Sequence, residues 1–271
     1  MRGRRKRLSS LIIGGHMRGN ILTEQNLVHL TEPSAPVARL VCFPHAGAGA
    51  YAFGTWMEQV HEDIELIAVR LPGRETLFEQ VPLRSMSLIG SSVGDILLNV
   101  AQPGPIGLFG YCAGAFAAFE AARRMTERQE SPSLLAVCSQ VAPHANVNDT
   151  VVHNLPAGQL KEVLRALGGT QPIVLEREEF WELAEPALRA DYEAAETYSA
   201  SPEPKLSCDI IAFCGSHDDD VPPQEIGAWA EVTTGTCATH LLDGGHFLLQ
   251  SRAADVLAEV EHHLLGARPG E

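Results

Sequence analysis

One cysteine lies in a pattern that is typical of an enzyme nucleophile. The segment Gly110-Tyr111-Cys112-Ala113-Gly114 has the form G-x-C-x-G and joins an apolar run of strand length to a stretch of helical spacing. In such a nucleophile elbow the central side chain lies on a strained turn, and two glycines avoid collisions that a Cβ atom would cause. The dipole of the following helix favours a thiolate at Cys112. The alternative is a buried cysteine packed beside two glycines.

A nucleophile of this kind needs a base, and the base needs an acid that holds its tautomer, in the chain order nucleophile, acid, base. A polar loop after one apolar strand contains Asp218, the predicted acid, with Asp219 and Asp220 as neighbours of the same chemistry. The loop after the next strand contains His246, the predicted base, although a surface histidine would give the same pattern. Because Cys112, Asp218 and His246 each follow a strand in the required order, together they favour a catalytic triad.

Acyl transfer also needs hydrogen-bond donors for the developing oxyanion. These are usually the backbone N–H groups of the residue after the nucleophile and of a loop after an early strand. The first donor would be Ala113, and the second would be Ala46 in the small-residue loop 43–50. We expect the neighbouring His45 to orient this loop rather than to react. The sequence contains no Walker, EF-hand, G-x-G-x-x-G or H-E-x-x-H motif, so we expect neither a metal nor a nucleotide cofactor.

These residues need a scaffold that brings the ends of strands together at one edge. Short apolar runs of strand length alternate along the chain with longer amphipathic stretches of helical period. The alternation predicts an α/β fold with a mostly parallel sheet flanked by helices on both faces. The predicted strands cover 37–43, 64–70, 106–110, 134–141, 209–214 and 238–242, and the predicted helices cover 87–100, 113–128, 224–233 and 248–265.

The alternation is interrupted once, at about residues 143–204, where helical patterns occur without a convincing strand. Two helices are predicted in this insertion, over 155–167 and 178–198. A helical insertion after a strand is placed to form a lid over the carboxyl edge of the sheet, where ligands bind in open α/β sheets. An ordinary helical subdomain without a gating role fits the same pattern.

The charge of the chain is distributed unevenly. The sequence has 20 basic and 34 acidic side chains, which gives a net charge of −14. Residues 1–20 contain six of the basic side chains and no acidic one, so the rest carries 14 basic against 34 acidic groups, or −20. We predict a disordered basic leader over 1–35 and one folded domain over 36–268. The acidic domain would repel phosphate backbones, so we predict no nucleic-acid partner for it.

The sequence also indicates the cellular compartment of the protein. The sequence contains no apolar run of about 18 residues or more, and its start is too short and polar for an export signal, so we predict a cytoplasmic protein without a membrane partner. Its six cysteines include no C-x-x-C pair, which fits neither a zinc site nor a disulfide scaffold. The five cysteines expected in the core are Cys42, Cys138, Cys208, Cys214 and Cys237.

The motifs together resemble a known family, the type II thioesterases that work beside polyketide synthases and nonribosomal peptide synthetases. These enzymes have the α/β-hydrolase fold, and the resemblance extends from about Arg39 to Leu265. The motifs that carry it are Phe43-Pro44-His45-Ala46-Gly47, Leu71-Pro72-Gly73-Arg74-Glu75, Gly110-Tyr111-Cys112-Ala113-Gly114, Ala142-Pro143-His144, Leu167-Gly168-Gly169-Thr170, Leu188-Arg189-Ala190-Asp191, Ala228-Trp229 and Gly244-Gly245-His246-Phe247.

The resemblance implies roles for individual residues. It gives Cys112 the position of the nucleophile, Asp218 that of the acid and His246 that of the base, with the N–H groups of Ala46 and Ala113 forming the oxyanion hole. It gives the insertion the place of the family's lid. The implied substrates are acyl groups held as thioesters on the phosphopantetheine arm of an acyl or peptidyl carrier protein. The expected partner is therefore a carrier protein, with no cofactor resident in this chain, which we expect to be a monomer.

The sequence departs from the family at the nucleophile, where the usual G-H-S-M-G is replaced by Tyr111, Cys112 and Ala113. Attack by serine turns a thioester into a more stable oxyester, whereas attack by cysteine exchanges one thioester for another of similar energy. We therefore expect a thioesterase that forms a covalent acyl-enzyme, with an acyl or aminoacyl transferase to a thiol or an amine as the alternative. A third possibility is a binding partner without turnover, against which Asp218 and His246 argue.

Overall fold

The computed structural model describes residues 21–100, 104–146 and 151–266. Within them one sheet has the strand order β1-β3-β2-β4-β5-β6-β7, where β1 and β3 are antiparallel and every other neighbouring pair is parallel. The predicted α/β class with a mostly parallel sheet is confirmed. The strands are β1 (Leu27–His29), β2 (Ala38–Phe43), β3 (Ile64–Val69), β4 (Ile106–Tyr111), β5 (Leu134–Cys138), β6 (Asp209–Gly215) and β7 (Cys237–Leu242).

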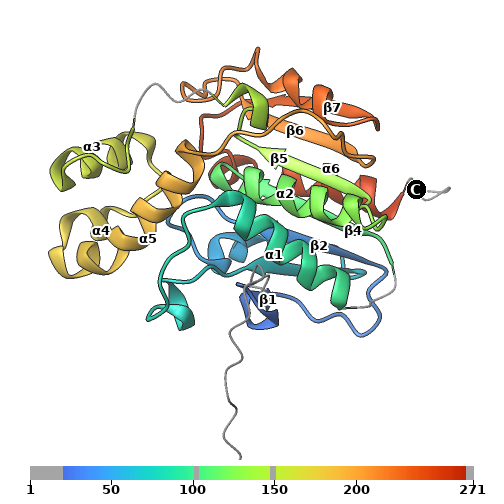
Figure 1. Cartoon of the computed structure of the whole chain (residues 1–271), viewed down its shortest axis with the longest axis horizontal. Helices are drawn as coiled ribbons and strands as arrows, with labels where there is room; N and C mark the ends of the chain where they lie inside the picture. The colour runs from blue at the N-terminus through green and yellow to red at the C-terminus, as the bar shows by residue number, and fades with distance from the viewer. Residues whose placement is uncertain (1–20, 101–103, 147–150, 267–271) are drawn as a thin grey trace, which may run out of the picture.

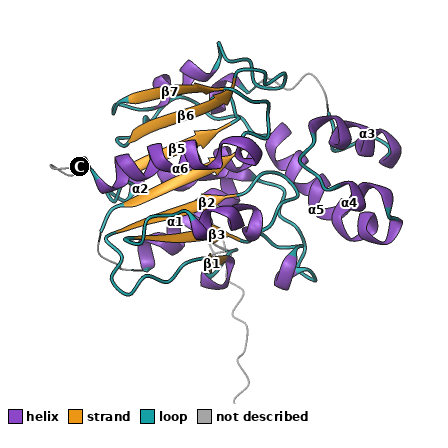
Figure 2. Cartoon of the chain, turned by 180° about the vertical axis from the view of Figure 1, so that it is seen from behind, coloured by secondary structure: helices purple, strands orange, loops and turns teal. Residues whose placement is uncertain are grey.

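Helices cover both faces of the sheet. Helices α1 (Met86–Asn99) and α2 (Ala113–Glu127) lie in front of it in Figure 1, and α6 (Leu249–Leu265) lies on the other face in Figure 2. The central strand β2 shows why its apolar run is continuous, since Val41 packs into the core under α1 and α2 while Leu40 packs into the core under α6. Short 3-10 helices cover Glu24–Asn26, Ala50–Glu58, Glu75–Leu77, Pro143–Ala145 and Ile226–Val232.

The predicted element boundaries agree with the structure to within about two residues in most cases. Strand β5 is shorter than expected and ends at Cys138, because Ser139 adopts a positive φ of 54° that interrupts the extended backbone. The predicted helix over 224–233 is a 3-10 helix over Ile226–Val232. Of the five cysteines expected in the core, four are buried and Cys237, at the start of the edge strand β7, is only partly buried.

The boundary of the predicted leader is too late in the chain. Residues 1–20 lie outside the described part, but β1 lies within the predicted leader 1–35 and pairs with β3 at the edge of the sheet. Asn26, which is 2% exposed, donates its side-chain amide to the Arg70 carbonyl at 2.8 Å, and the Arg70 N–H donates to the Asn26 carbonyl at 2.7 Å. A three-residue strand is too short to show a hydrophobic period, so the pattern did not indicate it.

The insertion is helical, as predicted, and lies beyond the ends of the strands, on the left in Figure 1. It contains α3 (Ala157–Leu167), α4 (Pro172–Glu176) and α5 (Glu178–Glu196), of which the five-residue α4 was not predicted. The helices share a small core of their own, formed by Leu160, Leu164, Leu175, Trp181 and Leu188. We call these three helices the lid; a gating movement of the lid stays a prediction. In the described part of the chain no helix is long and apolar enough to cross a membrane.

Candidate active site

The turn between β4 and α2 has the strained geometry that the G-x-C-x-G pattern predicts. The backbone of Cys112 adopts φ 49° and ψ −125°, a conformation that residues other than glycine rarely adopt. A Cβ atom on Gly110 would lie 2.3 Å from Cα of Ala115, and one on Gly114 would lie 2.3 Å from the carbonyl oxygen of Phe43. Both glycines are therefore required by close backbone contacts, and the partly buried Cys112 lies at the N-terminus of α2.

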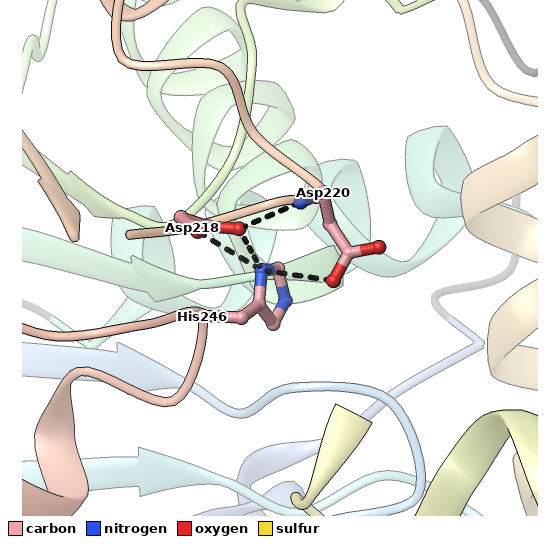
Figure 3. Close-up of side chains that lie close together, drawn as sticks. All are labelled: Asp218, Asp220 and His246. Carbon is pink, nitrogen blue, oxygen red and sulfur yellow. Dashed lines mark hydrogen bonds and ion pairs between the residues drawn. The ribbon is translucent and has the colours of Figure 1, made fainter. Parts of the chain in front are cut away.

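The three residues of the predicted triad lie together. The Nε2 atom of His246 is 3.2 Å from Sγ of Cys112, and its Nδ1 atom is 3.1 Å from each carboxylate oxygen of Asp218. The Asp218 side chain is buried, and its Oδ1 atom accepts hydrogen bonds of 3.0 Å from the N–H groups of Asp220 and Val221. Figure 3 shows the carboxylate at the Nδ1 side of the imidazole, whereas the thiol lies at Nε2.

The neighbouring acids do not occupy this position. Asp219 is exposed, and the Asp220 carboxylate lies 4.0 Å from His246 Nδ1, beyond hydrogen-bond distance. Burial raises the pKa of Asp220, although the charge of His246 acts in the opposite direction. Asp218, Asp220 and His246 could together hold a cation, because their ligand atoms lie within 4.8 Å of one another (Figure 3). In the structure, however, His246 already contacts Asp218 through Nδ1 and the Cys112 thiol through Nε2.

The surroundings of His246 favour its charged form. Burial of the ring acts to lower the pKa of His246, but the charge of Cys112 and the hydrogen bonds with Asp218 and Cys112 outweigh it and raise that pKa above its ordinary value. An imidazolium between a carboxylate and a sulfur can act as the acid for a departing thiolate. This arrangement can attack a carbonyl carbon and then donate a proton to a leaving group.

The two predicted oxyanion donors face the same cavity as the thiol. Ala113 is the first residue of α2, and Ala46 lies on the loop after β2, where the Ala48 N–H closes a turn on the His45 carbonyl at 3.1 Å. Both alanines line the cavity beside Cys112. Their N–H groups can therefore act on a carbonyl oxygen of a bound acyl group.

His45 is placed for a structural role, as expected. Its ring packs edge-on against Tyr111 at 5.3 Å and Phe247 at 5.1 Å between centroids. Burial and the charge of His246 lower the pKa of His45 to about 4. Its Nδ1 atom has no hydrogen-bond partner among the described residues. The neutral ring thus connects the loop after β2 to the segment that carries the predicted base.

The cavity above the thiol lies between the sheet edge and the lid and has a volume of about 760 Å³. Polar side chains beyond the triad line it. Apart from Asp219 and Asp220, which the sequence offered as neighbours of Asp218, the motifs did not indicate them as site residues. Helical spacing could have indicated Tyr192, because it lies on α5 four residues before Glu196 and therefore on the same side of the helix. Both residues line the cavity. The polar residues in the lining, besides the triad, are Gln140, Asn146, Tyr192, Glu196, His217, Asp219 and Asp220.

Comparison with known proteins shows the family to which the chain is similar. A model of the thioesterase domain family matches residues 38–264. The chain is 35% identical to the thioesterase PikA5 of Streptomyces venezuelae, covering 85% of this chain and 82% of that protein. It is 34% identical to the gramicidin S biosynthesis protein GrsT of Aneurinibacillus migulanus, covering 80% of this chain and 84% of that protein.

Solved structures agree with the sequence comparisons. The structure of the type II thioesterase BorB from the borrelidin biosynthetic cluster superposes with a TM-score of 0.81 at 34% identity, covering 90% of this chain and all of that chain. The family match includes β2 and most of α6, and therefore the whole of the candidate site. The chain belongs to the thioesterase domain family.

Proposed function

We propose that the chain hydrolyses acyl groups bound as thioesters to the phosphopantetheine arm of an acyl or peptidyl carrier protein, in polyketide or nonribosomal peptide biosynthesis. The observation that carries the proposal is the 3.2 Å contact between Cys112 Sγ and His246 Nε2 beside a cavity under the lid. The similarity to PikA5, GrsT and BorB supports the pathway class.

In the first half of the reaction, the Cys112 thiolate attacks the carbonyl carbon of the thioester. The oxygen that becomes negative is stabilised by the N–H groups of Ala46 and Ala113. The tetrahedral intermediate then expels the phosphopantetheine sulfur, which takes the proton held on Nε2 of His246. The products of this step are the free carrier thiol and an acyl group on Cys112.

In the second half, the now neutral His246 removes a proton from a water molecule that attacks the acyl-cysteine. The oxyanion forms at the same site, and its collapse releases the carboxylic acid and restores the thiolate opposite the imidazolium. Asp218 keeps the tautomer and orientation of the ring through both halves. The substrate brings its own phosphopantetheine, so the proposed chemistry needs no cofactor held by this chain.

The partner in this proposal is the carrier protein, and we propose a cytoplasmic monomer that meets it there. Carrier proteins are commonly acidic, and the chain beyond residue 20 carries a net charge of −20, so net charge does not attract one to the folded part. Docking would then depend on a local basic patch or on the basic leader.

One observation favours a second candidate, transfer of the acyl group to another thiol or an amine. An acyl group on Cys112 would be a thioester, whose energy is close to that of the substrate, so its transfer to another thiol would be nearly thermoneutral. Hydrolysis and transfer share the first half-reaction and differ only in the acceptor.

The experiment that separates these functions follows intact masses of the protein mixed with an acyl-loaded carrier protein, with and without an unloaded acceptor carrier or an amine. Free acid formed without an acceptor supports hydrolysis. An adduct of Cys112 that persists until an acceptor is added supports transfer. No adduct and no product, with several acyl groups tested, would instead indicate a binding partner without turnover.

Two variants of the nucleophile complete this test. We predict that Cys112→Ala abolishes turnover, and full activity in that variant would disprove the assigned nucleophile. Cys112→Ser would form an oxyester, which is less easily transferred, so the ratio of hydrolysis to transfer should rise if transfer is the native reaction. An unchanged product ratio in Cys112→Ser would contradict that explanation.

A further inference from the structure

A buried ion pair connects the lid to the loop that carries Ala46. The Nη1 and Nη2 atoms of Arg74 donate to the Oδ2 and Oδ1 atoms of Asp191 at 2.6 and 2.8 Å. Arg74 is 7% exposed and lies directly before the 3-10 helix Glu75–Leu77, whereas Asp191 is 2% exposed and lies on α5. Buried ion pairs add little net stability, because desolvation opposes their attraction, so this pair calls for another explanation.

Both members of the pair also bind the backbone of the loop after β2. The Gly47 N–H donates to Asp191 Oδ2 at 2.7 Å, and Arg74 Nη1 donates to the Ala48 carbonyl at 2.9 Å. Gly47 has a positive φ of 77°, and a Cβ atom there would lie 2.2 Å from a methyl group of Leu188 on α5. The two residues that follow Ala46 are thus fixed by polar contacts to Arg74 and Asp191.

A small cavity lies behind the loop, next to the Asp191 carboxylate. This cavity of about 10 Å³, with room for about one water, is lined by Ala46, Ala113 and Asp191. The other residues of its wall are apolar, so Asp191 supplies the polar side chain on this side of the loop. Arginine suits its role here, because the planar guanidinium can bind a carboxylate with two nitrogens and still donate to a carbonyl.

We infer that Arg74 and Asp191 are positioning residues that hold the Ala46 N–H in the oxyanion hole and make its position depend on α5 of the lid. The inference rests on the proposed function, because it takes Ala46 as an oxyanion donor. Neither residue touches the reacting atoms; both act through the backbone of residues 46–48. The sequence motifs contained both residues but assigned them no role, since they are 117 positions apart.

The test uses Asp191→Asn. The Asp191 carboxylate accepts from three N–H groups, whereas an asparagine has one acceptor oxygen, so one donor would face its NH₂ group. We expect acylation of Cys112 by a short acyl thioester of N-acetylcysteamine to slow on the order of 10- to 100-fold, as displaced oxyanion donors do. Alkylation of Cys112 by iodoacetamide, followed by peptide mass, forms no oxyanion and should keep its wild-type rate.

If Asp191→Asn slowed acylation and alkylation to the same extent, the inference would be overturned, because equal losses indicate a general disturbance of the site. A folded Asp191→Asn protein that acylates at the wild-type rate would overturn it as well. Arg74→Lys serves if Asp191→Asn does not fold, since it keeps the buried charge but loses the fork. We expect slower acylation in this variant with unchanged alkylation, and wild-type rates would again overturn the inference.

The matched control is Arg84→Gln, which removes an exposed ion pair between Arg84 and Glu193 of the same helix α5 without touching the loop. It should acylate at the wild-type rate; a loss as large as that of Asp191→Asn would refute a specific role for the buried pair. Failure of the proposed function looks different. The wild type would then form neither an acyl adduct nor a product, or Cys112→Ala would retain turnover, whatever Asp191→Asn does.

Discussion

Gly114 allows a quantitative test of the oxyanion hole, because it lies where the two segments that carry the proposed donors are in close contact. A Cβ atom on Gly114 would lie 2.3 Å from the carbonyl oxygen of Phe43 and 2.5 Å from that of Pro44. Real Cβ contacts are essentially never under 3.0 Å, so Gly114→Ala must move α2 and the loop after β2 apart by about 0.7 Å. Ala113 belongs to the first segment and Ala46 to the second. Since a displacement of about 1 Å can cost about 10²-fold in rate, we predict that kcat/KM falls on the order of 10- to 100-fold.

The assay measures thiol release from an acyl thioester and, separately, unfolding in urea. Overpacking of this kind should also lower the free energy of unfolding by about 1–3 kcal/mol. Gly158→Ala is the control, because a Cβ atom on this residue of α3 has nothing within 4 Å. Its kcat/KM should match the wild type. A folded Gly114→Ala protein with wild-type kcat/KM would refute the placement of the oxyanion hole between these two segments.

Two further predictions concern the triad and its surroundings. Asp218→Asn should lower kcat by at least about 10²-fold, because an amide disfavours the His246 tautomer that carries its proton on Nδ1 and leaves Nε2 free towards Cys112. Asp219→Asn should have little effect, and equal losses of kcat in the two variants would contradict the assignment of the acid. The pKa of His45 is about 4 in the folded protein and about 6.5 in the unfolded chain, so folding favours the neutral ring. The resulting contribution to the free energy of unfolding is complete above about pH 6.5 and is lost as the pH falls towards 4, by up to about 3 kcal/mol. Urea unfolding should therefore show a smaller decline over that interval in His45→Gln, and an equal decline would contradict this linkage.

Local patterns in the chain were sufficient for the scaffold and for the identity of the triad candidates. Continuous apolar runs predicted β2, β3 and β4, because the residues of each strand pack alternately into the two cores on either side of the sheet. The elbow at Cys112 was predictable because its backbone conformation excludes Cβ atoms at Gly110 and Gly114, a requirement that the residue types themselves reveal. The order of strand ends then indicated Asp218 and His246 without knowledge of any distance.

Tertiary packing was needed for everything that depends on which distant segments meet. The three-residue β1 has no period to detect, and it exists because β3 offers it a sheet edge. The sequence predicted Asp218, but the contact that separates it from Asp220 depends on the loop, which turns the Asp218 carboxylate towards His246 and leaves that of Asp220 4.0 Å away. The Arg74–Asp191 pair likewise joins residues 117 positions apart. Such contacts follow from strand order and the placement of α5, which no local hydrophobic period or backbone preference encodes.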